Sequence, residues 1–286
     1  MELLKSYDSV NELRRFLEEN GFAMRRRFGQ NFLVSPGGRE KILNILDVRK
    51  NSTVWEVGPG LGALTHKLVK IAGSLTVFEI DRGFIRYLDE AFGNYPHFRI
   101  VEGDAVKSWK EEGLDKKVPD RIVGNLPYNA ASAIMASYIE HNFIPEKMVF
   151  TVQKEMGERV SAVPGSKSYS SFSMLCQFRC SVKDCGDLKP GAFYPQPEVT
   201  SRIIELVPHG RYPEADQKLF FTFITDLFTS RRKKIRNNLL KGRLSVSYSR
   251  ETILAAAGHA GIDVDDRGEN IDVDRAVKAV LFLQKV

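Results

Sequence analysis

The sequence predicts an α/β fold with a mostly parallel sheet covered by helices on both faces, followed by a small all-helical domain. From Thr53 onward, short apolar runs alternate with stretches of helical periodicity. This alternation is typical of βαβ units and a parallel sheet. Beyond about residue 210 the helical periodicity continues without a convincing strand. We therefore expect two domains, at residues 1–209 and 210–286.

Each expected element has a local signal. The strands are the apolar runs Val54–Val57, Leu75–Phe78, Phe98–Val101, Ile122–Val123 and Met148–Val152. The helices between them are expected at Leu61–Ala72, Phe84–Phe92 and Ala130–His141. Those of the second domain are expected at Leu219–Phe228, Arg231–Leu240, Arg250–Ala257 and Asp274–Gln284.

An N-terminal extension precedes the sheet. Residues 9–20 predict an amphipathic helix, because Ser9 and Glu12 form a capping box and Gly21 follows the last turn. An irregular basic segment comes next, and Ser35-Pro36 opens a second helix that ends at Leu46.

Composition and charge indicate a cytoplasmic protein with a polyanionic partner. Hydrophobic residues make up 43% of the chain and charged residues 27%, as in ordinary globular proteins. No run of 18 apolar residues predicts a membrane span, and the N-terminus has no apolar signal core. The net charge is +6, and basic residues cluster in two blocks. Such blocks either bind nucleic acid or form solvated helix faces. They contain Arg25, Arg26 and Arg27, and Arg231, Arg232, Lys233, Lys234 and Arg236.

The cysteines predict no metal site. Cys176, Cys180 and Cys185 lack paired C-x-x-C spacing and have no histidine cluster nearby in the sequence. We expect reduced, partly buried thiols.

The ends of the first three expected strands carry the residues of a nucleotide-like ligand site. Gly58, Gly60 and Gly62 follow the first strand, where glycine allows a tight turn and close approach of a ligand. Glu79 ends the second strand, at a place where an acid accepts hydrogen bonds from a ribose. Asp104 follows the third strand and either accepts the amine of an adenine or caps a helix. NAD and S-adenosylmethionine both fit this pattern.

The fourth strand separates these two ligands, because it ends in Gly124-Asn125-Leu126-Pro127-Tyr128. The side-chain oxygen of Asn125 and the carbonyl of Leu126 can accept the two N–H groups of an exocyclic amine. They would stabilise the positive charge that develops as this amine attacks a methyl sulfonium. Pro127 stiffens the backbone, and Tyr128 offers a face on which a base can stack. A hydride-transfer site has no evident use for these groups.

With these residues in hand, the chain resembles the rRNA adenine N6,N6-dimethyltransferases over nearly its whole length. The matching motifs, in family order, are Arg27-Phe28-Gly29-Gln30-Asn31-Phe32-Leu33, GPGLGALT from Gly58, NLPYN from Asn125, Gln153-Lys154-Glu155, Pro164-Gly165-Ser166-Lys167-x-Tyr169, Phe193-Tyr194-Pro195-Gln196-Pro197-Glu198-Val199-Thr200-Ser201, and Arg231-Arg232-Lys233-Lys234-Ile235-Arg236-Asn237. The sequence departs from the family pattern at Ala130-Ala131, which usually bears a hydroxyl, and at Ser170, which is usually glycine.

The resemblance implies a Rossmann-like methyltransferase sheet at residues 1–209 and an RNA-binding helical domain at 210–286. It implies that S-adenosylmethionine is held by Asn31, Leu33, Gly58, Gly60, Glu79, Asp104 and Asn125, with S-adenosylhomocysteine as the product. It also implies that Asn125, Leu126, Tyr128 and Phe193 surround the target adenine. For Phe193, a core position beside a proline-rich turn is the alternative.

The implied activity is dimethylation of two adjacent adenosines in small-subunit (16S) rRNA, linked to biogenesis of the 30S subunit. The substrate would be this rRNA, the subunit or its precursor, and we expect a monomer. Three alternatives stay open. They are a large-subunit (23S) methylase of the antibiotic-resistance type, a non-catalytic RNA-binding assembly factor, and an NAD oxidoreductase.

Overall fold

The computed structural model describes residues 3–22 and 31–286. The basic residues Arg25, Arg26 and Arg27, with the first part of the motif that follows them, lie outside the described residues. The chain forms two compact units. The first unit comprises residues 1–157 and 183–207, and the second comprises 158–182 and 208–286.

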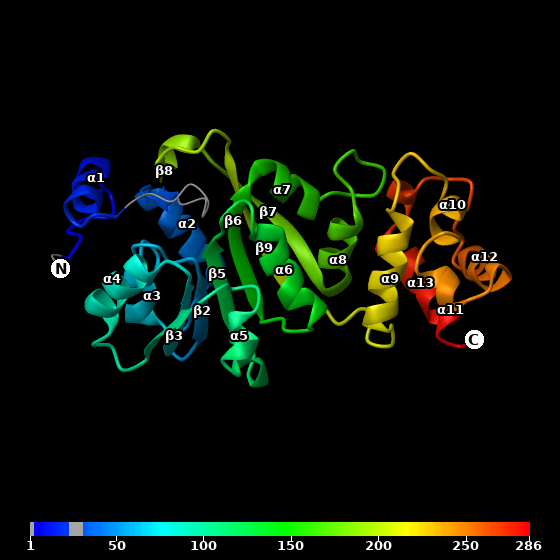
Figure 1. The fold of residues 1–286 in the computed structure, drawn as a ribbon, viewed down its shortest axis with the longest axis horizontal. Coiled ribbons are helices and arrows are strands. Elements are labelled where there is room, and N and C mark those ends of the chain that lie inside the picture. Colours follow the sequence, from blue (N-terminus) through cyan, green and yellow to red (C-terminus); the bar gives the residue numbers. More distant parts are fainter. Residues whose placement is uncertain (1–2, 23–30) are drawn as a thin grey trace. The chain divides into compact units, whose positions relative to one another are not determined.

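A seven-stranded sheet forms the centre of the first unit (Figure 1), in the order β4-β3-β2-β5-β6-β9-β7. Adjacent strands from β4 to β6 are parallel, and β9 runs antiparallel to β6. The five parallel strands contain all five of the expected apolar runs. A separate pair joins β1 to β8. The strands are β1 (Phe32–Leu33), β2 (Thr53–Val57), β3 (Ser74–Glu79), β4 (Phe98–Glu102), β5 (Arg121–Asn125), β6 (Lys147–Gln153), β7 (Cys180–Leu188), β8 (Phe193–Tyr194) and β9 (Ser201–Pro208).

The alternation of side chains along these strands builds two apolar layers. Val54 of β2 belongs to a core cluster that includes Val77 and Val123 of the neighbouring strands. Trp55 points to the opposite face, where its ring lies 5.0 Å from that of Phe143. Successive strand residues face opposite sides, so both faces of the sheet are covered.

Helices cover these faces. They are α1 (Val10–Glu19), α2 (Pro36–Leu46), α3 (Thr65–Ile71), α4 (Arg82–Phe92), α5 (Ser108–Glu111), α6 (Ala131–Glu140) and α7 (Lys154–Val160). The Ser9 cap is confirmed, because its hydroxyl accepts from the Glu12 amide at 3.2 Å. The helix expected from Leu61 begins only at Thr65, because Gly58, Gly60 and Gly62 all have positive φ and hold the preceding residues in a turn.

The second unit is built mainly from helices. They are α8 (Ser171–Arg179), α9 (Gln217–Leu227), α10 (Ile235–Leu239), α11 (Leu244–Ser247), α12 (Arg250–His259) and α13 (Val273–Leu283). The helix expected from Arg231 begins at Ile235, with Lys234 as its N-cap. Residues 158–182, which we expected in the first domain, belong to this unit. The reason is packing, since the ring of Phe178 stacks on that of Phe220 at 4.0 Å.

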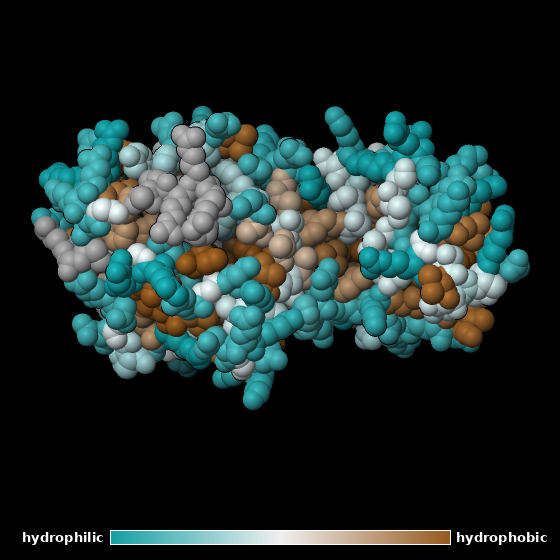
Figure 2. All heavy atoms as spheres, in the orientation of Figure 1, coloured by the Kyte–Doolittle hydropathy of each residue, from teal (hydrophilic) through white to brown (hydrophobic). Residues whose placement is uncertain are grey.

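Hydrophilic side chains cover most of the face seen in Figure 2, and hydrophobic side chains gather in patches between them. Among residues 3–22 and 31–286, none of the helices has the length and apolar character needed to cross a membrane.

Candidate active site

A cavity of about 350 Å³ opens beside the carboxyl ends of β2, β3, β4 and β5. This is the edge of a parallel sheet where ligands are expected. All seven of the residues that the resemblance assigns to the cofactor line this cavity. They are Asn31, Leu33, Gly58, Gly60, Glu79, Asp104 and Asn125. The structure therefore brings together residues that lie up to 94 positions apart in the chain, such as the bonded pair Asn31 and Asn125.

The glycine turn after β2 exposes its backbone to the cavity. Gly58 and Gly60 have φ values of 67° and 57°, in the left-handed region that favours glycine. A Cβ atom on Gly60 would lie 3.1 Å from a ring carbon of Phe32, another cavity residue. Glycine at this position thus keeps the turn and the aromatic wall close together without steric conflict.

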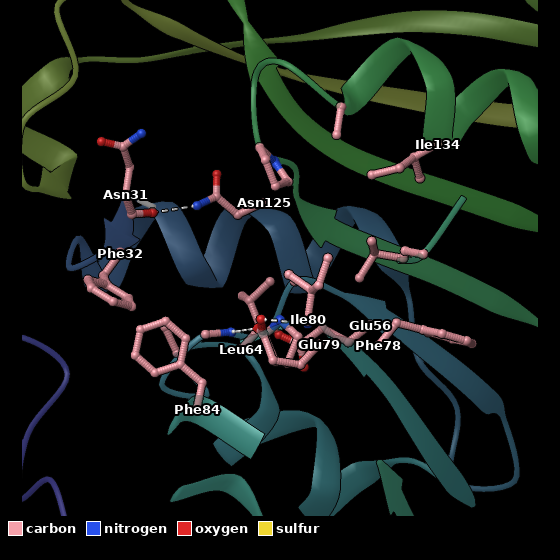
Figure 3. A pocket seen from close by; sticks show the side chains of 18 of the residues that line it. Asn31, Phe32, Glu56, Leu64, Phe78, Glu79, Ile80, Phe84, Asn125 and Ile134 are labelled. Carbon is pink, nitrogen blue, oxygen red and sulfur yellow. Dashed lines mark hydrogen bonds between the residues drawn. The ribbon is translucent and has the colours of Figure 1, made fainter. Parts of the chain in front are cut away.

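Glu79 lies at the end of β3 with only 6% of its surface exposed. Its Oε1 accepts from the amides of Ile80 and Asp81, both at 2.9 Å, and its Oε2 accepts from the Gly60 amide at 3.1 Å. Burial raises the pKa of Glu79, and these amides oppose the rise. A carboxylate offers about four acceptor positions, and three are filled here, so one position, on Oε2, remains for a ribose hydroxyl. Figure 3 shows Glu79 at the wall of the cavity, close to Ile80.

Glu56 is a cavity residue that sequence reasoning missed. Its side chain is 2% exposed, and its Oε2 accepts from the hydroxyl of Thr65 at 2.7 Å. Burial raises the pKa of Glu56 to about 8, and nearby Glu79 adds to the rise. The signal that could have identified Glu56 is its place as an acid inside the apolar run Val54–Val57. Burying a carboxyl group lowers the stability of the fold, so a buried acid is a candidate functional residue.

Asp104 has a local role and a cavity role at once. Its Oδ1 accepts from the Val106 amide at 2.9 Å, and the side chain is exposed beside the cavity. The helix α5 that follows has Lys107, not Asp104, at its N-cap. The cap alternative is therefore wrong, and the second carboxylate oxygen is the one left for a ligand.

Asn125 is the last residue of β5, and its side chain is oriented by one hydrogen bond. Its Nδ2 donates to the carbonyl of Asn31 at 2.7 Å, as the dashed line in Figure 3 shows. This bond requires the amide orientation in which Oδ1 points away from Asn31. Among the described residues, none donates to this oxygen, so it is available as an acceptor. A Cβ on Gly58 would lie 3.8 Å from the Asn125 carbonyl, which places this strand end beside the glycine turn.

Leu126 and Pro127 continue the same turn. The Leu126 amide donates to the Thr151 carbonyl at 3.0 Å, and its side chain is 2% exposed. The Pro127 carbonyl accepts from the amides of Ala130 and Ala131, both at 3.0 Å. These bonds anchor the backbone on both sides of the Leu126 carbonyl, which is the second predicted acceptor.

Tyr128 and Phe193 do not line the cavity. The Tyr128 hydroxyl lies 2.6 Å from Oγ of Ser201, and burial raises the pKa of this phenol. Phe193 is 1% exposed within the core cluster, opposite Leu33 in the β1–β8 pair. In this structure the ring of Phe193 is therefore a core side chain rather than a surface on which a base can stack.

The two departures from the family pattern have different settings. Ala130 lines the cavity and stands at the N-cap of α6, which has no side-chain cap. Ser170 stands at the N-cap of α8, where its amide donates to Oγ of Ser173 at 3.1 Å. Ser170 thus gives α8 a capping box that glycine would not provide.

The second basic block is partly neutralised within the second unit. Arg231 pairs with Glu269 at 2.5 Å, Lys234 pairs with Asp265 at 2.8 Å, and Arg236 pairs with the same aspartate. Arg232 and Lys233 are exposed and form no ion pair with the described part of the chain. Arg232 and Lys233 are therefore the two residues of the second basic block that have no carboxylate partner among the described residues.

No group of three or more His, Cys, Asp and Glu side chains within residues 3–22 and 31–286 is arranged to hold a metal ion. The described cysteines are free thiols, and burial raises the pKa of Cys180 to about 12.

A model of the family described as ribosomal RNA adenine dimethylase matches residues 21–285. A protein of Treponema denticola named ribosomal RNA small subunit methyltransferase A is 41% identical over 261 residues, covering 90% of this chain and 89% of the relative. A protein of the same name from Borreliella afzelii is 38% identical over 273 residues, covering 96% and 93%.

Two solved structures share the fold. A dimethyladenosine transferase from Plasmodium falciparum has a TM-score of 0.74 at 22% identity, covering 88% of this chain and 96% of its own. The 23S rRNA methyltransferase ErmE has a TM-score of 0.66 at 22% identity, covering 89% and 100%. At this identity the two structures support the Rossmann-like methyltransferase fold and nothing finer.

Proposed function

This chain belongs to the ribosomal RNA adenine dimethylase family, and from that membership we propose that it dimethylates adenosine N6 amines in small-subunit rRNA. It is an S-adenosylmethionine-dependent rRNA adenine dimethyltransferase, as its family and the names of its relatives indicate. We propose that its substrate is a pair of adjacent adenosines in 16S rRNA, and that the reaction belongs to 30S biogenesis. The observation that carries the proposal is the single cavity lined by all seven expected cofactor residues.

The residues of the cavity fit the cofactor. Glu79 offers one remaining acceptor position for a ribose hydroxyl, Asp104 offers an acceptor for the adenine amine, and apolar side chains form the remaining wall. These apolar residues include Phe32, Leu64, Ile80, Phe84 and Ile134. When bound, S-adenosylmethionine supplies an electrophilic methyl group on a sulfonium. Burial raises the pKa of Glu56, the second acid of the cavity, to about 8, so this side chain is mostly neutral at pH 7 and adds little negative charge to the site.

In this proposal the target amine is held by Asn125, which lines the cavity, and by the carbonyl of Leu126, the next residue in the chain, whose side chain is buried. The Asn125 Oδ1 and the Leu126 carbonyl accept its two N–H groups, which favours a tetrahedral nitrogen and stabilises the charge that develops during attack. Because Asn31 and Thr151 already hold the two residues through hydrogen bonds, these acceptors are preorganised. No general base is needed before attack, since the aminium product is acidic and loses its proton afterwards.

The test is methyl transfer from labelled S-adenosylmethionine to unmethylated small subunits and, separately, to large-subunit rRNA. We expect N6,N6-dimethyladenosine only in the digested small-subunit RNA. Label in the large-subunit RNA would instead favour the resistance-type methylase, and binding without transfer would favour the assembly factor. The names of the relatives favour small-subunit rRNA over large-subunit rRNA as the substrate.

The second unit supplies RNA affinity in this proposal. Arg232 and Lys233 are the residues of the second basic block that face solvent without a carboxylate partner among the described residues. We propose that the enzyme works as a monomer in the cytoplasm, where the small subunit is assembled. Sedimentation velocity of the purified chain, alone and with RNA, tests the monomeric state.

A further inference from the structure

Residues 3–22 pack behind the wall of the cofactor cavity. The ring of Phe22 lies 5.4 Å from that of Phe84, which in turn lies 5.5 Å from that of Phe32. Phe32 and Phe84 line the cavity, whereas none of residues 3–22 does. The N-terminal segment therefore backs the aromatic wall from outside the site.

A buried arginine connects this segment to the wall. The side chain of Arg39, on α2, is 3% exposed and forms an ion pair with Asp8. Its Nη1 donates to the carbonyl of Leu33 at 3.0 Å and to the carbonyl of Tyr7 at 3.3 Å. A buried guanidinium needs a counter-charge, because an unpaired charge in a protein interior is strongly destabilising. Among the described residues, Asp8 is its sole carboxylate partner.

The backbone segment from Asn31 to Leu33, which forms part of the cavity wall, is held by a hydrogen bond at each end. Leu33 accepts from Arg39, and Asn31, two residues earlier, accepts from Asn125 at the rim. Both wall residues line the cavity. The guanidinium of Arg39 and the side-chain amide of Asn125 thus bind the same short backbone segment, two residues apart. A shift at Leu33 would therefore move Asn31 as well.

Tyr7 fixes the same end of the segment. Its ring stacks on His66 at 4.4 Å with an interplanar angle of 20°, and its hydroxyl lies 3.5 Å from that of Tyr87. The side chain of Asp8, by contrast, is 56% exposed. Asp8 can therefore be changed without opening a cavity in the core.

We propose that the Asp8–Arg39 ion pair is a positioning device for the cofactor site, which ties residues 3–22 to the Leu33 carbonyl and so sets the affinity for S-adenosylmethionine. The proposal rests on the proposed function, because the ligand is the cofactor of that reaction. Arg39 acts through the backbone of Asn31 and Leu33 and does not touch the reacting atoms.

The experiment compares Asp8→Asn, Arg39→Lys and the double variant in the full-length chain. Calorimetry measures the Kd for S-adenosylmethionine and for S-adenosylhomocysteine, and steady-state assays on small subunits separate KM from kcat. For Asp8→Asn we expect a Kd about three- to tenfold higher, a matching rise in KM, and kcat within about twofold of the unmodified protein. Arg39→Lys should shift Kd in the same direction, because one ammonium cannot reproduce the guanidinium fork.

The double variant should bind as weakly as the weaker single variant and no weaker, since the two residues act as a unit. Glu112→Gln is the matched control. It breaks the exposed Arg99–Glu112 pair, which has a separation of 2.9 Å, and should leave Kd unchanged. Melting temperatures of all variants are recorded beside Kd.

An unchanged Kd in Asp8→Asn would overturn the proposal, whether or not the melting temperature falls, because a purely structural pair lowers stability alone. Additive losses in the double variant would overturn it as well. Failure of the unmodified chain to bind either compound would contradict the proposed function instead. If Arg39→Lys does not fold, Asp8→Asn, with its exposed and nearly isosteric side chain, decides the question.

Discussion

Asn125→Ala tests the two roles that we propose for this amide. The substitution removes Oδ1, the proposed acceptor for the target amine, and also removes Nδ2, which donates to the Asn31 carbonyl at 2.7 Å. The first loss acts on the transition state, and the second acts on the wall that binds the cofactor. The two losses should therefore appear in different kinetic constants.

The magnitudes follow from these two contacts. Losing one preorganised charge-stabilising group lowers kcat by about 10²- to 10³-fold, or about 2.7–4 kcal/mol. Losing the hydrogen bond from Asn125 to the Asn31 carbonyl costs about 0.5–1.5 kcal/mol. If this whole cost weakens cofactor binding, the Kd of S-adenosylmethionine rises roughly two- to twelvefold. We expect kcat to fall by at least ~10²-fold and cofactor affinity to fall within the smaller range.

The assay is transfer of labelled methyl groups to unmethylated small subunits at saturating S-adenosylmethionine, with Kd measured separately by calorimetry. Asn44→Ala is the control, because Asn44 is an exposed amide on α2 that does not line the cavity. Near-normal turnover in Asn125→Ala would refute the acceptor role. A large loss of affinity with unchanged kcat at saturation would refute the division of the two effects.

Three further changes test other parts of the structure. Burial raises the pKa of Glu56 from 4.5 to about 8, so its stabilising contribution is complete below pH 4.5 and is lost as pH rises through 8. Urea unfolding of the cofactor-free protein should show this loss between pH 5 and pH 8.5, and Glu56→Gln should flatten it. Changing Arg232 and Lys233 together to alanine should reduce the salt slope of RNA binding by about 1.4–1.8, without altering the affinity for S-adenosylmethionine. Phe193→Ala should destabilise the fold by about 3–5 kcal/mol, as expected for an aromatic side chain that is 1% exposed.

Each of these has a control or a contrary result. A pH profile that is the same in Glu56→Gln and the unmodified protein would mean that another group causes the loss. Lys116 and Lys117, changed together to alanine, are the matched control for the basic pair and should leave the salt slope unchanged. For Phe193→Leu, a loss of turnover on RNA at an unchanged melting temperature would show that the ring stacks on the base after all.

The sequence predicted the five parallel strands of the sheet, because alternating apolar runs of strand and helix length specify βαβ units locally. It did not predict β9 and β7, which complete the sheet beside β6. It also placed the expected cofactor residues at strand ends, and these line one cavity because the carboxyl ends of parallel strands meet at one edge. The sequence placed residues 158–182 in the wrong unit, because nothing local indicates that Phe178 will stack on Phe220, more than 40 positions later in the chain.

What the sequence by itself determined is the set of chemical groups at the strand ends: the glycine turn, Glu79, Asp104 and the Asn125–Tyr128 motif. The tertiary structure alone decided which of these face a common cavity and which are buried beside it. It brought Glu56 into the site, packed Phe193 into the core and paired three charges of the second basic block with distant carboxylates. The physical reason is that residue type and spacing fix local backbone geometry, whereas burial and charge pairing depend on neighbours that only the folded chain supplies.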